Sequence, residues 1–131
     1  VGSYEKSRVL CDEGLKLLRK AIQLSPKDPM LPLYLVMAGV PNFNDERYDE
    51  ARIWAEKALH ENPNFPTGHR FLAAVLGMLG DLDAARAAYE NFDRMAPGMT
   101  VNACVQAVPF AFEEDARRFA EGLRRAGMPE G

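Results

Sequence analysis

A chain of 131 residues with 47% hydrophobic content is long enough for one core and too short for two ordinary domains, so we expect a single domain over residues 1–131. Its 16 basic and 19 acidic residues leave a net charge of −3, which lacks the positive field that nucleic-acid binding needs. No apolar run approaches the roughly 18 to 20 residues of a membrane span and no signal-peptide pattern is present, so we expect a cytoplasmic protein without a membrane partner.

The first half of the chain predicts helices of uneven regularity. Residues 7–26 have helical spacing and end at a proline, whereas residues 31–40 fit a helix only loosely. The stretch PNFNDER at residues 41–47 is rich in turn-forming Pro, Asn and Asp, so we expect a long turn there. A further helix follows this turn and leads to Pro63.

Residues 66–97 form the most regular stretch and predict a pair of antiparallel helices. Apolar side chains recur at helical spacing through residues 67–79, which defines the first helix. Gly80 then suits a left-handed helix terminus, and Asp81 is a candidate N-cap for the second helix. The second helix carries alanines, which let helix axes approach closely, with two larger side chains beside them, Tyr89 and Phe92.

The tail, residues 100–127, predicts a helical cap. Thr100 is a candidate N-cap for a short helix over residues 101–107, which must end before Pro109 because proline disfavours helical geometry in the residue before it. A second helix over residues 113–126 carries apolar residues on one face and arginines on or beside the other. A stack of helices needs such an atypical last element with a polar outer surface.

One internal spacing occurs three times. In each copy a small residue is followed by a small or apolar residue seven positions later and by proline twelve positions later. The interval from Pro63 to Pro97 is 34 residues and that from Pro26 to Pro63 is 37, so we expect three added residues in the turn at 41–47. The spaced residues and one aromatic neighbour are the predicted repeat-packing positions: Gly14, Ala21, Ala51, Ala58, Ala85, Tyr89 and Phe92.

This period and these small residues resemble the tetratricopeptide repeat (TPR) family. The family pattern W-x2-L-G-x2-Y, A-x3-F, P is matched in residue class by His69, Leu72, Ala73, Leu76, Ala85, Tyr89 and Pro97. The resemblance implies an all-α fold, a right-handed α-α superhelix of about seven antiparallel helices. Its parts would be the second helix of a first repeat at 7–26, a repeat with a lengthened turn at 29–63, a regular repeat at 66–97, and capping helices at 100–127.

In TPR proteins the first helices of successive repeats line a concave groove, and such a surface accepts a helix or an extended peptide. By matched offsets, the resemblance places five residues in this groove: Leu33, Met37, Arg70, Ala74 and Met78. We therefore expect a non-enzymatic interaction or scaffold module whose partner is a protein or peptide. The alternative is a homo-oligomerisation module, and the third interpretation is a small-ligand binder or an enzyme. The tail of the chain could also occupy the groove in place of a partner.

The tail carries a second resemblance, to the C-terminal TPR region of bacterial adenylate cyclase-like and transcriptional-regulator-like multidomain proteins. It rests on PGMTV at residues 97–101, VPF at 108–110 and FAEGLRRAGMPE at 119–130. This resemblance implies that the chain is a C-terminal regulatory part of a larger bacterial protein. It implies no cyclase activity, because the motifs of the catalytic domain are missing from the sequence.

No constellation of residues predicts catalysis, a cofactor or a metal site. Cys11 and Cys104 are far apart in sequence and belong to no CxxC or Cys/His cluster. His60 is expected near a helix C-terminus, where partial positive charge suits the helix dipole, and His69 at an aromatic packing position. The carboxylates cluster at predicted turns, where helix capping accounts for them.

Overall fold

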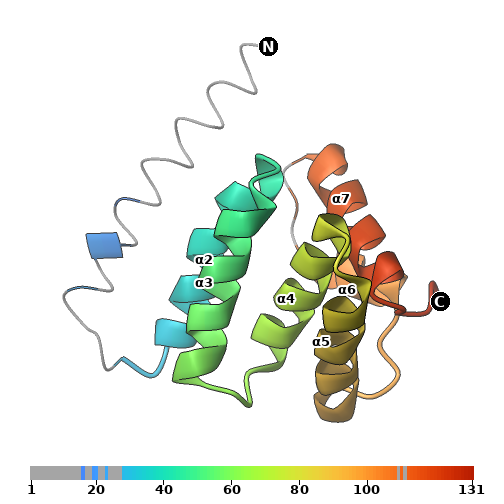
Figure 1. Ribbon diagram of the computed structural model, residues 1–131, viewed down its shortest axis with the longest axis horizontal. Helices are drawn as coiled ribbons and strands as arrows, with labels where there is room; N and C mark the ends of the chain where they lie inside the picture. Colours follow the sequence, from blue (N-terminus) through green and yellow to red (C-terminus); the bar gives the residue numbers. More distant parts are fainter. Residues whose placement is uncertain (1–15, 17–18, 21–22, 24–27, 109, 111) are drawn as a thin grey trace.

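The computed structural model describes Lys16, Arg19, Lys20, Gln23 and residues 28–108, 110 and 112–131 (Figure 1). Within the ranges from residue 28 onward the chain folds into six helices: α2 (Leu31–Asn44), α3 (Tyr48–Glu61), α4 (Pro66–Leu79), α5 (Leu82–Met95), α6 (Val101–Ala107) and α7 (Glu113–Arg125). These described ranges contain no strand, which confirms the predicted all-α fold. The rest of the helix predicted at 7–26, with Gly14 and Ala21, lies outside the described residues.

The first described pair, α2 and α3, packs along its length, and α3 then packs on α4. Asp28 forms a turn just before α2, because its side chain accepts a hydrogen bond from the Met30 N–H at 2.8 Å and its carbonyl accepts one from the Leu31 N–H at 2.9 Å. The buried face of α3 consists of alanines with no exposed surface, which lets the neighbouring helix axes approach closely: Ala51, Ala55 and Ala58.

Helix α2 continues one turn beyond its predicted end. The sequence predicts a turn from Pro41, whereas the helix passes through Pro41 and ends at Asn44. Proline removes one helical N–H, but the Pro41 carbonyl still accepts a hydrogen bond from the Asp45 N–H at 3.0 Å. The extra turn also buries Phe43 against aromatic rings of α4 and α7. Tertiary packing of Phe43 therefore outweighs the local preference for a turn.

This extension also changes where the three added residues lie. The spacing from the start of α2 to the start of α3 exceeds that from α4 to α5 by one residue, so the α2–α3 turn holds one addition. The stretch from Pro26 to Leu31 is two residues longer than that from Pro63 to Pro66, so the other two precede α2. The prediction that all three lie at residues 41–47 is wrong for those two.

The second pair, α4 and α5, has the predicted geometry. Gly80 ends α4 in the left-handed conformation, with φ 86°, and donates its N–H to the Leu76 carbonyl at 3.1 Å. Asp81 caps α5, because its side chain accepts a hydrogen bond from the Ala84 N–H at 3.3 Å. The inner face of α5 is buried through Ala85, Ala88 and Phe92.

Helices α6 and α7 lie on the α4–α5 side of the molecule (Figure 1). Thr100 caps α6 as predicted, since its Oγ1 accepts a hydrogen bond from the Ala103 N–H at 3.1 Å. Helix α7 has its most extensive contact with α4 and only a slight one with α5. It reaches α2 through Phe119, whose ring centroid lies 6.4 Å from that of Phe43. The predicted cap is therefore a helix placed along α4.

Candidate functional site

The five residues predicted to line one groove have very different surroundings. Met37 on α2 has half of its surface exposed, at 50%, and Leu33 on the same helix is partly buried. On α4, Ala74 has no exposed surface, while Arg70 and Met78 are partly buried. The structure thus leaves the α2 part of the predicted groove open to solvent and places α7 over the α4 part.

The α4 face consists of Arg70, Ala74, Gly77 and Met78, and α7 meets it backbone to backbone. A Cβ atom added to Gly77 would collide with the Gly122 carbonyl of α7, and a Cβ atom added to Gly122 would collide with the Ala74 carbonyl of α4. Only glycine at both positions permits this approach. Sequence reasoning did not identify this contact. Neither glycine has a left-handed φ, so backbone conformation gives no hint of the need for glycine.

Arg70 is partly buried and contacts the C-terminal helices. Its Cζ atom lies 6.0 Å from the centroid of the Phe119 ring, within reach of a cation–π interaction. Burial raises the pKa of the Cys104 thiol on α6, and the nearby Arg70 guanidinium opposes that shift through its charge and a hydrogen bond. Arg70 therefore makes intramolecular contacts in this conformation and is not a freely exposed cation.

An exposed apolar surface follows one side of α2. We define the α2 stripe as Met30, Leu33, Met37 and Val40, whose spacing of three and four residues places them on one helix face. Met30 and Val40 are 47% and 37% exposed, close to the 50% of Met37. Sequence reasoning named Leu33 and Met37 and missed the other two. The sequence shows the spacing of these four residues, but it does not show which face of α2 is buried.

The stripe ends beside a cluster of charged residues that joins α2 to α7. Arg118 of α7 donates hydrogen bonds to the Asn44 carbonyl at 3.4 Å and to the Asp115 carboxylate at 3.0 Å. Its guanidinium also lies 3.8 Å from carboxylate oxygens of Glu46 and Glu114. Burial raises the pKa of Asp115, the Arg118 charge opposes this shift, and the Glu114 charge adds to it.

A second apolar surface lies between α2 and α3. It is a hollow of about 650 Å³, open to solvent, whose lining combines three apolar with four polar residues: Leu31, Leu35, Ile53, Glu56, Lys57, His60 and Glu61. Ile53 is 53% exposed, slightly more than Met37 of the α2 stripe at 50%. The exposed His60 in the last turn of α3 belongs to this hollow.

The predicted repeat-packing positions that the structure describes lie on inward-facing sides of α3 and α5. Ala51, Ala58, Ala85 and Phe92 are buried, and Tyr89 is partly buried, with its pKa raised first by burial and then by the Asp93 charge. His69 is also buried, and its Nε2 donates a hydrogen bond to the Pro63 carbonyl at 2.7 Å. This contact fixes the start of α4 against the loop that precedes it.

Comparison of the chain with known protein families and with curated proteins finds no match. No helix in the described ranges is both long and apolar enough to cross a membrane. Among the same residues, no group of three or more His, Cys, Asp or Glu side chains could hold a metal ion.

Proposed function

We propose that this protein is a TPR-like interaction module that binds a helix or an extended peptide of a protein partner through the α2 stripe. The observation that carries the proposal is the set of large apolar side chains left exposed along one helix face. Completing the burial of each half-exposed methionine would contribute about 1 kcal/mol. Methionine is also flexible and polarizable, so such a stripe can adapt to a partner helix.

The arrangement of the helices supports the family part of this proposal. Helices α2 to α5 are four helices of 14 residues each, joined by short connections, and small residues occupy the buried faces of α3 and α5. Repeats of two helices cannot bury their apolar faces alone and do so by stacking. In such a stack, successive first helices expose one common side, which here carries the α2 stripe.

The proposal is tested by selecting ligands from a displayed library of short amphipathic helical peptides with the full chain as bait. We expect enriched peptides whose affinity falls about tenfold or more for Met37→Glu, because the new charge would be buried at the interface. Ile53→Glu is the matched control, since it adds the same charge at a similarly exposed position on another surface. Peptides that bind both variants and the parent equally would place the binding surface elsewhere.

Self-association is a second candidate, favoured by the hollow between α2 and α3. Two copies related by a twofold axis would each place the exposed Ile53 against the apolar lining of the other. Chromatography with light scattering over a range of concentrations measures this directly. We expect a dimer that Ile53→Asp disrupts and Met37→Asp preserves. A monomer at all concentrations contradicts this second function without affecting the first.

A further inference from the structure

Helix α7 fits the α4 face through a small set of side chains. Gly122 meets the backbone of α4, and its neighbours Phe119 and Leu123 are 6% and 0% exposed. These three residues lie within one helical turn of each other, so they form one narrow edge. Most of the other α7 side chains are charged, and those at both ends of the helix and at Arg117 are exposed, with 71% for the Arg117 side chain, whereas Asp115 is buried. This is the pattern of a helix bound in a groove by a few anchor residues.

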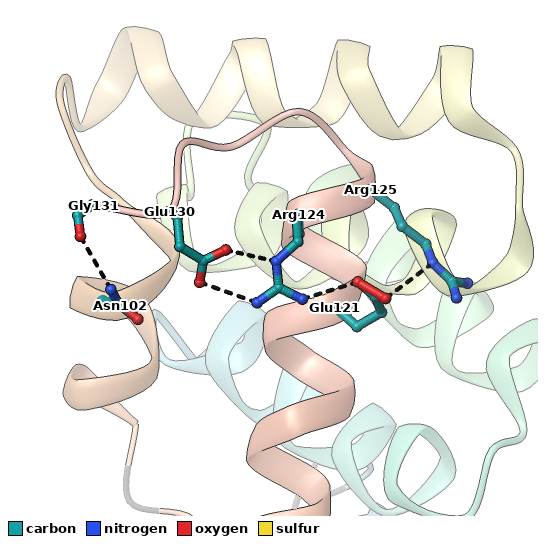
Figure 2. A network of polar contacts seen from close by, with 6 residues as sticks. All are labelled: Asn102, Glu121, Arg124, Arg125, Glu130 and Gly131. Carbon is teal, nitrogen blue, oxygen red and sulfur yellow. Dashed lines mark hydrogen bonds and ion pairs between the residues drawn. The ribbon is translucent and has the colours of Figure 1, made fainter.

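The segment that contains α7 is held together by its own contacts. We define the α6–α7 unit as residues 99–108, 110 and 112–131. The Val101 N–H donates a hydrogen bond to the Pro129 carbonyl at 2.8 Å, and the Asn102 N–H donates one to the Glu130 carbonyl at 3.2 Å. The Asn102 side chain also donates to the Gly131 carbonyl at 3.2 Å (Figure 2). The C-terminal residues are thereby attached to the start of α6.

Ion pairs connect the same C-terminal residues to α7. Arg124 donates two hydrogen bonds to the Glu130 carboxylate, at 2.6 and 3.0 Å, and a third to Glu121 at 2.9 Å (Figure 2). The Cys104 thiol of α6 lies 3.8 Å from the sulfur of Met128 and is buried. All of these contacts lie inside the α6–α7 unit, so they can persist if α7 leaves the α4 face.

Polar contacts from the α6–α7 unit to α2 and its following turn are longer and partly exposed. Arg118 lies 3.4 Å from the Asn44 carbonyl and 3.8 Å from a Glu46 oxygen, and the Glu46 side chain is 66% exposed. Screening by solvent weakens ion pairs of this kind. Besides these polar contacts, α7 is attached through its buried residues Phe119, Gly122 and Leu123 and through the contact of Phe119 with Arg70 of α4. A competing helix with the same residues could make these contacts instead.

We propose that α7 is an internal occupant of a helix-binding surface on α4, and that the protein's partner replaces it with a helix carrying the same Phe-x-x-Gly-Leu pattern. The partner helix would place its glycine against the Ala74 carbonyl and its aromatic ring beside Arg70, as α7 does. This inference rests on the proposed function and extends it from the α2 stripe to the α4 face. Because α7 reaches the end of α2, a helix in its place would lie next to the residues that end the stripe.

The test uses a fluorescent peptide with the sequence of residues 112–127 and the full chain. Leu123→Asp in the chain loosens α7, so we expect the peptide to bind this variant about tenfold more tightly than the parent. Arg117→Ala is the matched control chain, because it alters an exposed residue of the same helix. A second peptide with Gly122→Ala is more helical in isolation. It should nevertheless bind poorly, because its Cβ atom would collide with α4.

Equal binding to all three chains, or equal binding of the two peptides, would overturn the inference. A dimer of the parent chain in which cross-links join α4 of one copy to α7 of another would also overturn it, since a second copy would then be the occupant. These outcomes do not involve the α2 stripe. The peptide selection with Met37→Glu therefore succeeds or fails independently.

Hydrogen exchange in the unmodified chain provides a readout that does not depend on a variant being folded. If α7 leaves α4 without global unfolding, amides of α7 exchange about tenfold or more faster than the central amides of α4. Addition of the peptide should accelerate exchange in the chain's own α7 and leave α4 protected. Identical protection of α7 and α4 under all conditions would show that α7 is an inseparable part of the core and would overturn the inference.

Discussion

The outer faces of α2 and α4 were predicted to line one groove, but in the structure one face is exposed and the other is covered by α7. On α2, Met30, Met37 and Val40 are 47%, 50% and 37% exposed, and Leu33 is partly buried. On α4 the predicted Ala74 and the neighbouring Gly77, which was not predicted, are buried under α7. The difference is one of side-chain size. Small residues let another helix approach to backbone contact, whereas the row of longer side chains on α2 leaves an apolar surface that is exposed to solvent.

The largest expected effect comes from making the α4 face resemble the α2 stripe. Ala74→Leu places a large side chain where the backbones of α4 and α7 already touch, so we expect a loss of about 3 kcal/mol from the free energy of unfolding. Urea denaturation measures it. The matched control is Ala87→Leu on the exposed side of α5, which should change stability by less than about 0.5 kcal/mol. Equal effects at the two sites would contradict the close helix contact.

A smaller effect with an informative sign is expected for Gly77→Ala. In an exposed helix interior, alanine stabilises by about 1 kcal/mol relative to glycine. Here the added Cβ atom meets the Gly122 carbonyl, so we expect a net loss of about 1–2 kcal/mol. Thermal or urea unfolding measures whether Gly77→Ala lowers or raises the free energy of unfolding. Any stabilisation by Gly77→Ala would show that α7 lies farther from α4 than described.

Asp115→Asn tests the charged cluster where α7 meets α2, through the pH dependence of stability. Because burial raises the pKa of Asp115 above its ordinary value, the folded chain keeps the proton to higher pH than the unfolded chain does. The stabilising contribution of this group is therefore present below the ordinary carboxyl pKa and is lost as pH rises through the folded pKa.

Asparagine has no such titration, so the stability of Asp115→Asn relative to the parent should increase as pH rises from the ordinary carboxyl range towards neutrality. Urea unfolding at a series of pH values measures the difference. A relative stability that falls with pH would mean that the Arg118 charge outweighs burial in setting the pKa of Asp115. Glu113→Gln, at an exposed position of the same turn, provides the control.

The smallest expected effect is on the α2 side. Met37→Ala removes a side chain that is half exposed, at a position where both residues favour a helix, so stability should change by less than about 0.5 kcal/mol. Urea unfolding of this variant beside Ala74→Leu gives the comparison directly. A loss above about 2 kcal/mol for Met37→Ala would show that the stripe is part of the core and not a free surface.

Local sequence features were sufficient to predict the α4–α5 pair. Gly80 ends one helix and Asp81 begins the next because each depends on its own backbone and on neighbours within a few residues. Thr100 and its short helix follow from the same local rules. The sequence was less informative about α2, because Pro41 indicates a turn and the aromatic contacts that keep Phe43 in the helix come from distant residues.

The sequence by itself determined that the chain is helical, where α4 and α5 begin and end, and which positions on α3 and α5 are small enough for helices to pack closely. Only the tertiary structure decided that α7 lies along α4, that Gly77 and Gly122 touch, and that the α2 stripe stays exposed. The physical reason is the distance along the chain between the residues that interact. Helix formation and capping depend on residues within a few positions, whereas the covering of a helix face depends on segments some forty residues apart.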